Sequence, residues 1–237
     1  MDRTELDVLS TGPLVRTSLQ TVREAVSYRR HLLDAHLHWA APLMRGCIVD
    51  LGGKRDRTRG NFVPTPSVGD RWIYVNLDRT TRPDVLADVA AVPLDSSSAD
   101  CVVCTEVLEH VPDPLQCVRE AHRVLRSGGH LICSVPFLYP IHADPHDFQR
   151  FTEEGLRRLL SAFPSPHIRK MGGYLGTLGM TLEFGGRRLG RRRLWHRVAA
   201  RSLFEGGRLL QWFDLSSDGL ATTLPFTTGY FAIARKQ

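Results

Sequence analysis

The chain has 237 residues, 42% of them hydrophobic and 24% charged, which suits one large domain or one domain with a small cap. No apolar run approaches the roughly 20 residues that are needed to span a bilayer. The amino end also lacks the basic and then apolar pattern of a secretory signal. The composition therefore argues against a membrane-spanning protein and favours a cytoplasmic one.

The formal net charge of +6 is local, because seven arginines and no acidic residue lie between Arg187 and Arg201. The rest of the chain then has a net charge of −1, so a polyanionic partner of the whole protein is not indicated. Arginines at four-residue spacing from Arg193 to Arg201 predict a helix with a cationic side. This side is either solvated or in contact with an anionic membrane surface or a phosphate-bearing acceptor, which would make the protein peripheral to a membrane.

Strands and helices are expected to alternate along the chain. Helical spacing of apolar residues predicts an amino-terminal helix over 17–39, and a second helix is expected over Val107–Leu125, with a turn at Pro112 and Pro114 and an end at Gly128-Gly129. Short apolar runs predict strands at Cys47–Leu51, Trp72–Leu77, Asp100–Cys104, His130–Val135, Ile168–Met171 and Thr228–Ala234. The alternation predicts a doubly wound α/β sheet with its ligand at the carboxyl ends of the strands.

Polar residues and glycines follow three of these strands. Gly52-Gly53 lets a ligand approach the backbone, and Asp50 can order that loop. Asp78 ends the next strand, where a carboxylate can accept hydrogen bonds from the two hydroxyls of a ribose. Asp88 and Val89 can pair with an adenine. Each acid taken singly could equally be a loop cap.

The order of these motifs resembles the class I S-adenosylmethionine-dependent methyltransferases, particularly the methyltransferase type 11 group. The resemblance rests on Val49-Asp-Leu-Gly-Gly53, Asn76-Leu-Asp78, Ala87-Asp-Val89, Asp100-Cys-Val-Val-Cys-Thr-Glu-Val-Leu-Glu-His-Val-Pro112 and Leu125-Arg-Ser-Gly-Gly-His-Leu-Ile132. It implies a Rossmann-like sheet of seven strands, mostly parallel with the last strand antiparallel.

The resemblance also implies S-adenosyl-L-methionine as the cofactor. Gly52 and Gly53 would face its methionine part, Asp78 its ribose, and Asp88 with Val89 its adenine, while Thr105 and Glu106 would lie beside its amino acid portion. Glu109 and His110 are expected to be mainly structural. One departure is Lys54, which stands where the family usually has a second glycine and could crowd the cofactor or pair with its carboxylate.

The segment after the fifth expected strand holds the candidate base. His142, His146 and Asp147 lie in a loop that must cover the active site, and a histidine oriented by a carboxylate can deprotonate a hydroxyl. Alternatively the loop is a structural lid, in which Asp147 pairs with Arg150 and Thr152 caps the helix Glu153–Leu160. A metal held by this loop is not expected, because Pro145 separates the two histidines. Tyr28, Tyr139 and Arg150 are expected to contact the acceptor.

Two further groups of chemically capable residues are interpreted as structural. Cys101 and Cys104 form a CxxC pair without a second pair, which favours a core strand over a redox or zinc site. His31, His36 and His38 on the amino-terminal helix favour packing or surface roles over ligation.

The predicted organisation is a helical cap over 1–42, a cofactor-binding core over 43–172, an arginine-rich helical insertion over 173–225 and a last core strand over 226–237. The predicted activity is O-methylation of a small metabolite or glycosyl-type acceptor. A non-catalytic binding or scaffold protein of the same fold remains an alternative, and RNA methylation a weaker one, because no Asn-Pro-Pro-Tyr type motif follows the fourth strand.

Overall fold

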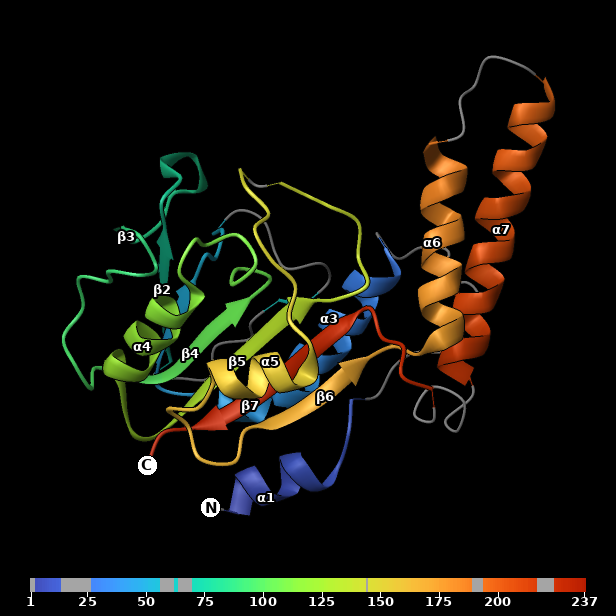
Figure 1. Cartoon of the computed structure of the whole chain (residues 1–237). Helices are drawn as coiled ribbons and strands as arrows, with labels where there is room; N and C mark the ends of the chain where they lie inside the picture. Colours follow the sequence, from blue (N-terminus) through green and yellow to red (C-terminus); the bar gives the residue numbers. More distant parts are fainter. Residues whose placement is uncertain are drawn as a thin grey trace.

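The computed structural model describes residues 3–13, 27–55, 62–63, 70–143, 145–188, 194–216 and 224–237. Its centre is a seven-stranded sheet with the order β3-β2-β1-β4-β5-β7-β6 (Figure 1). The strands are β1 (Cys47–Leu51), β2 (Arg71–Asn76), β3 (Val85–Leu86), β4 (Ala99–Thr105), β5 (Leu125–Pro136), β6 (His167–Met171) and β7 (Gly229–Arg235). Only β7 runs antiparallel to its neighbours, β5 and β6. The predicted doubly wound sheet with an antiparallel last strand is confirmed.

Helices cover both faces of the sheet. They are α1 (Arg3–Ser10), α3 (Tyr28–Ala40), α4 (Pro114–Val124), α5 (Glu153–Leu159), α6 (Tyr174–Arg188) and α7 (Leu194–Ser216). On one face, Leu33 and Leu37 of α3 pack with Ile48 and Phe231 of the sheet. On the other, the helices α4 and α5 pack against a second apolar cluster. Each fully buried leucine stabilises the fold by about 1.5–3 kcal/mol relative to an exposed one. The apolar clusters on both faces of the sheet therefore hold the strands, and with them the strand ends, in place.

The expected helix over Val107–Leu125 is wrong at its start. The structure forms α4 only from Pro114, because Pro112 and Pro114 have no N–H to donate and Asp113 caps the helix by accepting from Gln116 N at 3.0 Å. The residues from Val107 to Pro112 therefore form a loop directly after β4.

The expected helix end at Gly128-Gly129 is also wrong. The chain passes from α4 into β5 at Leu125, and both glycines lie inside that strand. A Cβ at Gly129 would lie 2.9 Å from the carbonyl oxygen of Asp100, so the glycine permits a close strand approach rather than a helix stop. The short strand β3 and the helix α1 were not predicted.

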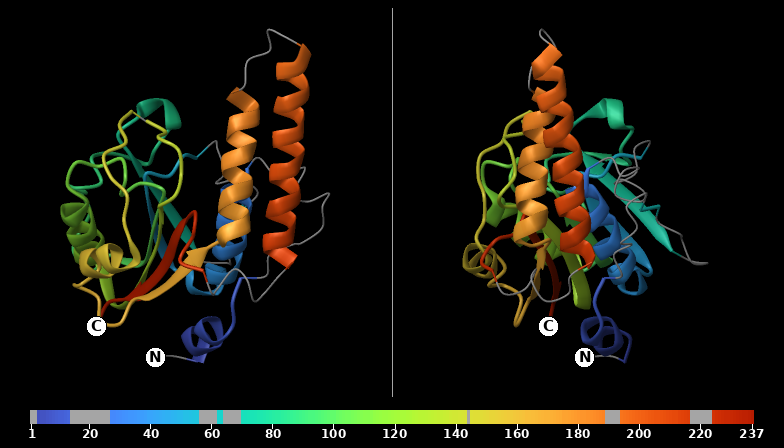
Figure 2. Two further views of the ribbon diagram at one scale, coloured as in Figure 1. Left: turned by 45° about the vertical axis from the view of Figure 1, so that its right-hand side comes forward. Right: turned by 90° about the vertical axis from the view of Figure 1, so that its right-hand side faces the viewer.

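The interval between β6 and β7 contains α6 and α7, which lie side by side and project beyond the sheet (Figure 2). Gly179 and Gly207 permit the close approach of these helices, since a Cβ at Gly179 would lie 2.3 Å from the Gly207 carbonyl oxygen. Arg187, Arg197 and Arg201 are exposed on this pair. Residues 191–193 lie outside the described part of the chain, as do residues 17–26 of the expected amino-terminal helix. Among the described helices, none has the length and apolar character that a membrane crossing requires.

Candidate active site

The carboxyl ends of the first strands meet at one edge of the sheet. The strand order β3-β2-β1-β4 places Asp88, Asp78, the Gly52-Gly53 turn and Thr105 along that edge in this sequence. Such a row suits an elongated ligand whose chemically different parts need different partners. The sequence expectation of one ligand shared by several strand ends is therefore consistent with the topology.

The turn after β1 requires its glycines. Gly52 has a φ of +74°, and a Cβ there would lie 2.5 Å from Cγ2 of Val107. A Cβ at Gly53 would lie 2.3 Å from Oδ2 of Asp50, which is buried beside it. Asn76 Nδ2 donates to the carbonyl oxygen of Gly53 at 3.0 Å and joins the turn to β2. The turn therefore packs closely against Val107 and Asp50, which leaves no room for a side chain at either glycine.

Asp78 and Asp88 are exposed at this edge. Asp78 Oδ1 accepts from Thr80 N at 2.8 Å and from Thr80 Oγ1 at 2.6 Å, and these bonds lower the pKa of its carboxyl. The charge of Lys54 also lowers that pKa, which puts the Lys54 ammonium within electrostatic reach of Asp78. Asp88 Oδ1 accepts from Ala90 N at 2.9 Å, and Val89 is buried. Both acids accept hydrogen bonds within their loops and still have side chains exposed to solvent, where a ligand can reach them.

Glu106, at the end of β4, is engaged by Arg29 of α3. Arg29 Nε donates to Oε2 at 2.7 Å and Nη2 donates to Oε1 at 2.5 Å, while Ser134 Oγ donates to Oε1 at 2.7 Å. Burial opposes ionisation of Glu106, but the guanidinium and the hydroxyl hold its pKa at about 2. The Glu106 carboxylate therefore anchors α3 over the strand ends, a role that the sequence did not indicate. Thr105 beside it is buried.

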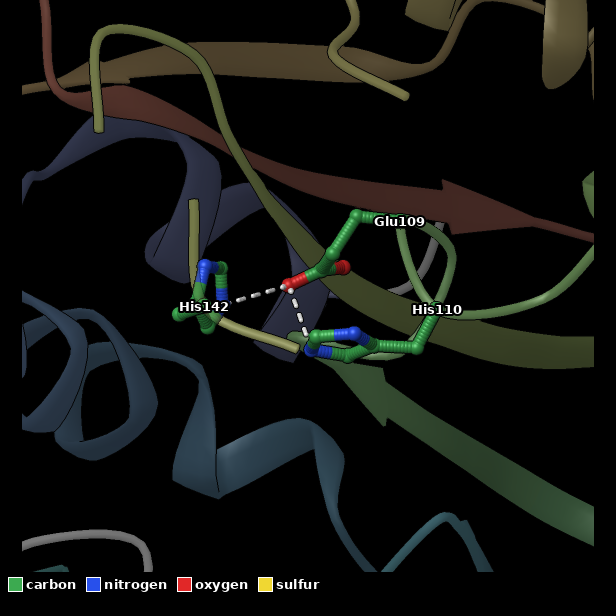
Figure 3. A group of neighbouring side chains, drawn as sticks. All are labelled: Glu109, His110 and His142. Carbon is green, nitrogen blue, oxygen red and sulfur yellow. Dashed lines mark ion pairs between the residues drawn. The ribbon is translucent and has the colours of Figure 1, made fainter. Parts of the chain in front are cut away.

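A cluster of Glu109, His110 and His142 lies beyond the ends of β4 and β5 (Figure 3). Nε2 of His110 and Nε2 of His142 each lie 3.6 Å from Glu109 Oε1. Glu109 is 0% exposed, and within the described residues neither of its oxygens has a hydrogen-bond partner. Burial raises the pKa of Glu109, and the carboxylate of Glu109 raises the pKa of His142. The sequence expectation of a mainly structural Glu109 missed this convergence.

The loop that follows β5 makes the contacts of a structural lid and also brings Asp147 to His142. Asp147 pairs with Arg150 through both oxygens, including Nη2 to Oδ2 at 2.7 Å, and Arg150 strongly lowers the Asp147 pKa. Thr152 Oγ1 accepts from Gly155 N at 3.1 Å and caps α5, as a structural lid predicts. Asp147 Oδ2 also accepts from the backbone N–H of His142 at 2.9 Å and lies 3.4 Å from His142 Nδ1.

His146 is exposed, and its ring lies beside Phe148 rather than in the cluster. Its carbonyl oxygen instead accepts from Nδ1 of His110 at 2.5 Å. Of the two candidate bases, the structure therefore brings only His142 together with Glu109 and Asp147.

An apolar cavity of about 490 Å³ opens beside this cluster. It is lined by Phe137, Leu138, Tyr139 and Pro140 after β5, by Tyr174, Thr177, Leu178, Met180, Thr181 and Phe184 of α6, and by Phe226. The Tyr139 ring lies 5.0 Å from the His142 ring and 5.7 Å from Phe184, measured between centroids. The expected acceptor contact at Tyr139 therefore lies between the cavity and the histidine.

Tyr28 lies away from this cavity, in contrast to its expected role at the acceptor. It is 2% exposed, and its hydroxyl donates to Asp214 Oδ2 of α7 at 2.5 Å. Burial raises the pKa of Tyr28 well above its usual value, and the nearby Asp214 charge adds to the effect. Tyr28 therefore ties α3 to α7.

The remaining candidates have the packing roles expected from the sequence. Cys101 and Cys104 are buried on opposite faces of β4, in two different apolar clusters. His36 packs against Trp39 and Phe231, and burial lowers its pKa to about 4. His38 packs edge-on against Phe62.

Comparisons with known proteins agree with this geometry. The family model of the methyltransferase domain matches residues 71–133. A ubiquinone biosynthesis O-methyltransferase of Marinobacter nauticus is 32% identical over 83 residues, 35% of this chain and 32% of that protein. An uncharacterized 37.1 kDa protein of a Streptomyces fradiae transposon is 47% identical over 51 residues, 22% of this chain and 15% of that protein. The matches thus span less than a third of these relatives.

The fold similarity extends further along the chain. A solved S-adenosylmethionine-dependent methyltransferase structure from Archaeoglobus fulgidus aligns with a TM-score of 0.53 and 15% identity, over 87% of this chain and 94% of that one. The family match and the strand order agree with the resemblance that the sequence motifs indicate. Residues 71–133 thus match the methyltransferase domain family, and the chain has the fold of the S-adenosylmethionine-dependent methyltransferases.

Proposed function

We propose that this chain is an S-adenosylmethionine-dependent O-methyltransferase that acts on a hydroxyl of a small, mainly apolar molecule. The observation that carries the proposal is the meeting of two features at one edge of the sheet. The row of strand-end residues suits the cofactor, and the apolar cavity shares Tyr139 with the His142 cluster. A methyl donor bound along the strand ends and an acceptor bound in the cavity would then lie at the same edge of the sheet.

The residues at the strand ends fit the cofactor in chemistry and in order. In the proposed complex Asp50, Gly52 and Gly53 hold the methionine part, Asp78 the ribose, Asp88 and Val89 the adenine, and Thr105 and Glu106 border the amino acid portion. Exposed carboxylates at β2 and β3 can accept hydroxyl and amino hydrogens. Glu106 takes part through its backbone, because its carboxylate is bound to Arg29.

The cavity supports an apolar acceptor rather than the glycosyl-type acceptor that the sequence also allowed. Its lining consists mainly of aromatic and aliphatic groups, and its polar side-chain groups are the hydroxyls of Tyr139, Tyr174, Thr177 and Thr181. A sugar would lose hydrogen bonds to water there without replacing them. Tyr139 lines the cavity beside His142, where the acceptor hydroxyl would lie. Arg150 is not part of the lining and approaches it only through the carbonyl oxygen of Pro140, at 3.2 Å from Nη2, so its proposed contact with the acceptor is indirect.

Bound S-adenosylmethionine supplies a methyl group on a sulfonium, and the C–S bond breaks as the acceptor oxygen forms the new C–O bond. The protein has to align the acceptor and to take its proton. His142 Nδ1 lies 3.2 Å from the carbonyl oxygen of Pro140 and 3.4 Å from Asp147, which favours a proton on Nδ1. Nε2 then carries the lone pair and accepts the hydroxyl proton of the acceptor.

The exposed arginines of α6 and α7 are proposed to contact phosphate groups, on a membrane surface or on the acceptor. Arg197 and Arg201 are exposed on α7, and Arg187 is exposed on α6, where it also pairs with Glu183. The helix pair projects beyond the sheet (Figure 2), and α6 supplies part of the cavity lining. An amphipathic acceptor could therefore enter the cavity from a charged surface.

The proposal is tested by incubating the protein with methyl-labelled S-adenosylmethionine and a metabolite extract of the source cells. We expect the label in a small molecule that partitions into organic solvent. Cofactor binding without label transfer to any fraction would favour the non-catalytic alternative. Label in the RNA fraction alone would contradict a small-molecule acceptor.

A further inference from the structure

We propose that Glu109, His110 and His142 form a binding site for a first-row divalent transition-metal cation, such as Zn²⁺, Mn²⁺ or Co²⁺. Each residue offers one donor atom, and the three atoms lie within 4.8 Å of one another. Two imidazole nitrogens and one carboxylate oxygen are a donor set that these cations accept, whereas Mg²⁺ and Ca²⁺ prefer oxygen alone.

The buried carboxylate is the observation that calls for a ligand. Glu109 is 0% exposed, and neither of its oxygens finds a hydrogen-bond partner among the described residues. A buried carboxyl group without a hydrogen-bond partner is unfavourable, so native proteins rarely keep one. Both neighbouring imidazoles lie 3.6 Å from Oε1, which is too long for a hydrogen bond but suits two ligands of one ion.

The two histidines are oriented from outside the cluster. Nδ1 of His110 donates to the carbonyl oxygen of His146 at 2.5 Å, and Nδ1 of His142 faces the carbonyl oxygen of Pro140 at 3.2 Å. A carbonyl oxygen can only accept, so both bonds place the proton on Nδ1 and leave Nε2 free to coordinate. Metal-ligating histidines characteristically have such an outer partner. The rings of His110 and His142 meet edge to face with centroids 4.9 Å apart, and both Nε2 atoms turn toward Glu109 (Figure 3).

Two of the three distances between donor atoms are close to those of an occupied site. Zn–N bonds of about 2.0–2.1 Å place neighbouring tetrahedral donors about 3.4 Å apart. The two N–O distances of 3.6 Å need to shorten by only a few tenths of an ångström to reach that spacing. Three protein ligands leave further positions of the cation open, as in catalytic rather than structural sites.

The position of the cluster gives the cation a role, which rests on the proposed methyl transfer. Glu109 and His110 follow β4, and His142 follows β5 beside the cavity. An acceptor hydroxyl on an open position would become more acidic, and its proton would pass to water rather than to His142. Metal-bound and metal-free protein therefore differ in the group that removes the proton.

The test is a titration of chelator-treated protein with Co²⁺ in the absence of cofactor and acceptor. The visible absorption of the bound Co²⁺ ion measures binding. We expect one Co²⁺ per chain, competition by Zn²⁺, and much weaker binding of Mg²⁺. His142→Ala, His110→Ala and Glu109→Gln should each weaken Co²⁺ binding at least about 100-fold, because each removes a direct ligand. His146→Ala is the matched control, since this histidine lies in the same loop with its ring outside the cluster, and its binding should be unchanged.

Thermal melting checks that each variant is folded, and His142→Ala is the safest, because that side chain is 33% exposed. The proposal is overturned if the folded wild type binds no Co²⁺, if the ligand variants bind as tightly as wild type, or if Mg²⁺ competes equally. These outcomes are independent of cofactor binding, so they leave the proposed methyl transfer standing. Failure of cofactor binding alone would overturn the methyl transfer and leave the metal site.

Discussion

Arg29 of α3 and Glu106 at the end of β4 form a two-point ion pair that connects α3 to the candidate active site. The side chain of Arg29 is 3% exposed and that of Glu106 is 16% exposed. Arg29 also lies over the ring of Tyr139, with its guanidinium carbon 5.7 Å from the ring centroid. The pair thus joins α3, the sheet and the cavity wall.

Breaking this pair should destabilise the protein strongly. Glu106→Gln leaves the Arg29 charge buried without its carboxylate, and we expect a loss of about 3–5 kcal/mol in the free energy of unfolding at neutral pH. Urea denaturation measures the loss. Glu153→Gln is the control, because its pair with Arg157 is exposed and should contribute less than about 1 kcal/mol.

The same pair gives stability a defined pH dependence. The folded pKa of Glu106 is about 2, below its value of about 4.3 in an unfolded chain. The pair therefore contributes its full stability above the unfolded pKa and loses it as the pH falls toward the folded one. We expect the difference between wild type and Glu106→Gln to shrink from pH 6 to pH 3, and a constant difference would contradict the ion pair.

Cofactor affinity should depend on the two exposed strand-end carboxylates. Asp78→Ala and Asp88→Ala should each weaken S-adenosylmethionine binding at least about tenfold, since a hydrogen bond to a charged group contributes about 1.5–3 kcal/mol. Asp95→Ala is the control, because this exposed acid precedes β4 at the opposite edge. Equal affinities in all three variants would place the cofactor elsewhere.

The apolar cavity should bind a neutral apolar dye such as Nile red. Leu178→Asp introduces a carboxylate into its lining and should weaken dye binding, measured by fluorescence titration, at least about tenfold. Leu209→Asp is a matched control, because Leu209 is a similarly exposed leucine on α7 outside the lining. Loss of binding in both variants would indicate a general surface effect rather than this cavity.

Removal of the proposed base should lower the rate rather than cofactor binding. In chelator-treated protein, His142→Ala should reduce kcat about 100-fold at saturating cofactor, the range for loss of a positioned general base. His122→Ala on α4 provides the control, because this ring packs against Phe163 on the far side of the core. Unchanged turnover in His142→Ala would remove this histidine from the reaction.

The exposed arginines are tested separately from the core. Arg197→Gln combined with Arg201→Gln should weaken binding to phosphatidylglycerol vesicles about 30-fold, from about 1 kcal/mol for each arginine near an anionic surface. Cofactor affinity should stay unchanged. If the wild type binds the vesicles as weakly as the double variant but binds inorganic phosphate, these arginines contact a soluble phosphate group instead of a membrane.

Local sequence patterns predicted the fold more fully than the site. The strand runs and the acids that follow them depend on residues close in sequence, so β1, β2, β4 and the positions of Asp78 and Asp88 were predictable. Two predictions of helix ends failed because the same residue types also serve other structural purposes. Glycines at 128 and 129 served a close strand approach rather than a helix end, and the prolines at 112 and 114 delayed α4.

The site residues that sequence reasoning missed depend on distant contacts. Arg29 and Glu106 are 77 positions apart, and Tyr28 meets Asp214 across 186 positions. A signal for the cluster of Glu109, His110 and His142 was present, since Glu109-His110 follows one expected strand and His142 follows the next. Parallel neighbouring strands bring such residues to one edge, but the sequence does not show that Glu109 is buried with no hydrogen-bond partner among the described residues.

The most direct test of the account is a calorimetric titration of the whole chain with S-adenosylmethionine. The account predicts saturable binding of one cofactor per chain, weakened by Asp78→Ala and unchanged by Asp95→Ala. No detectable binding at millimolar cofactor would contradict it.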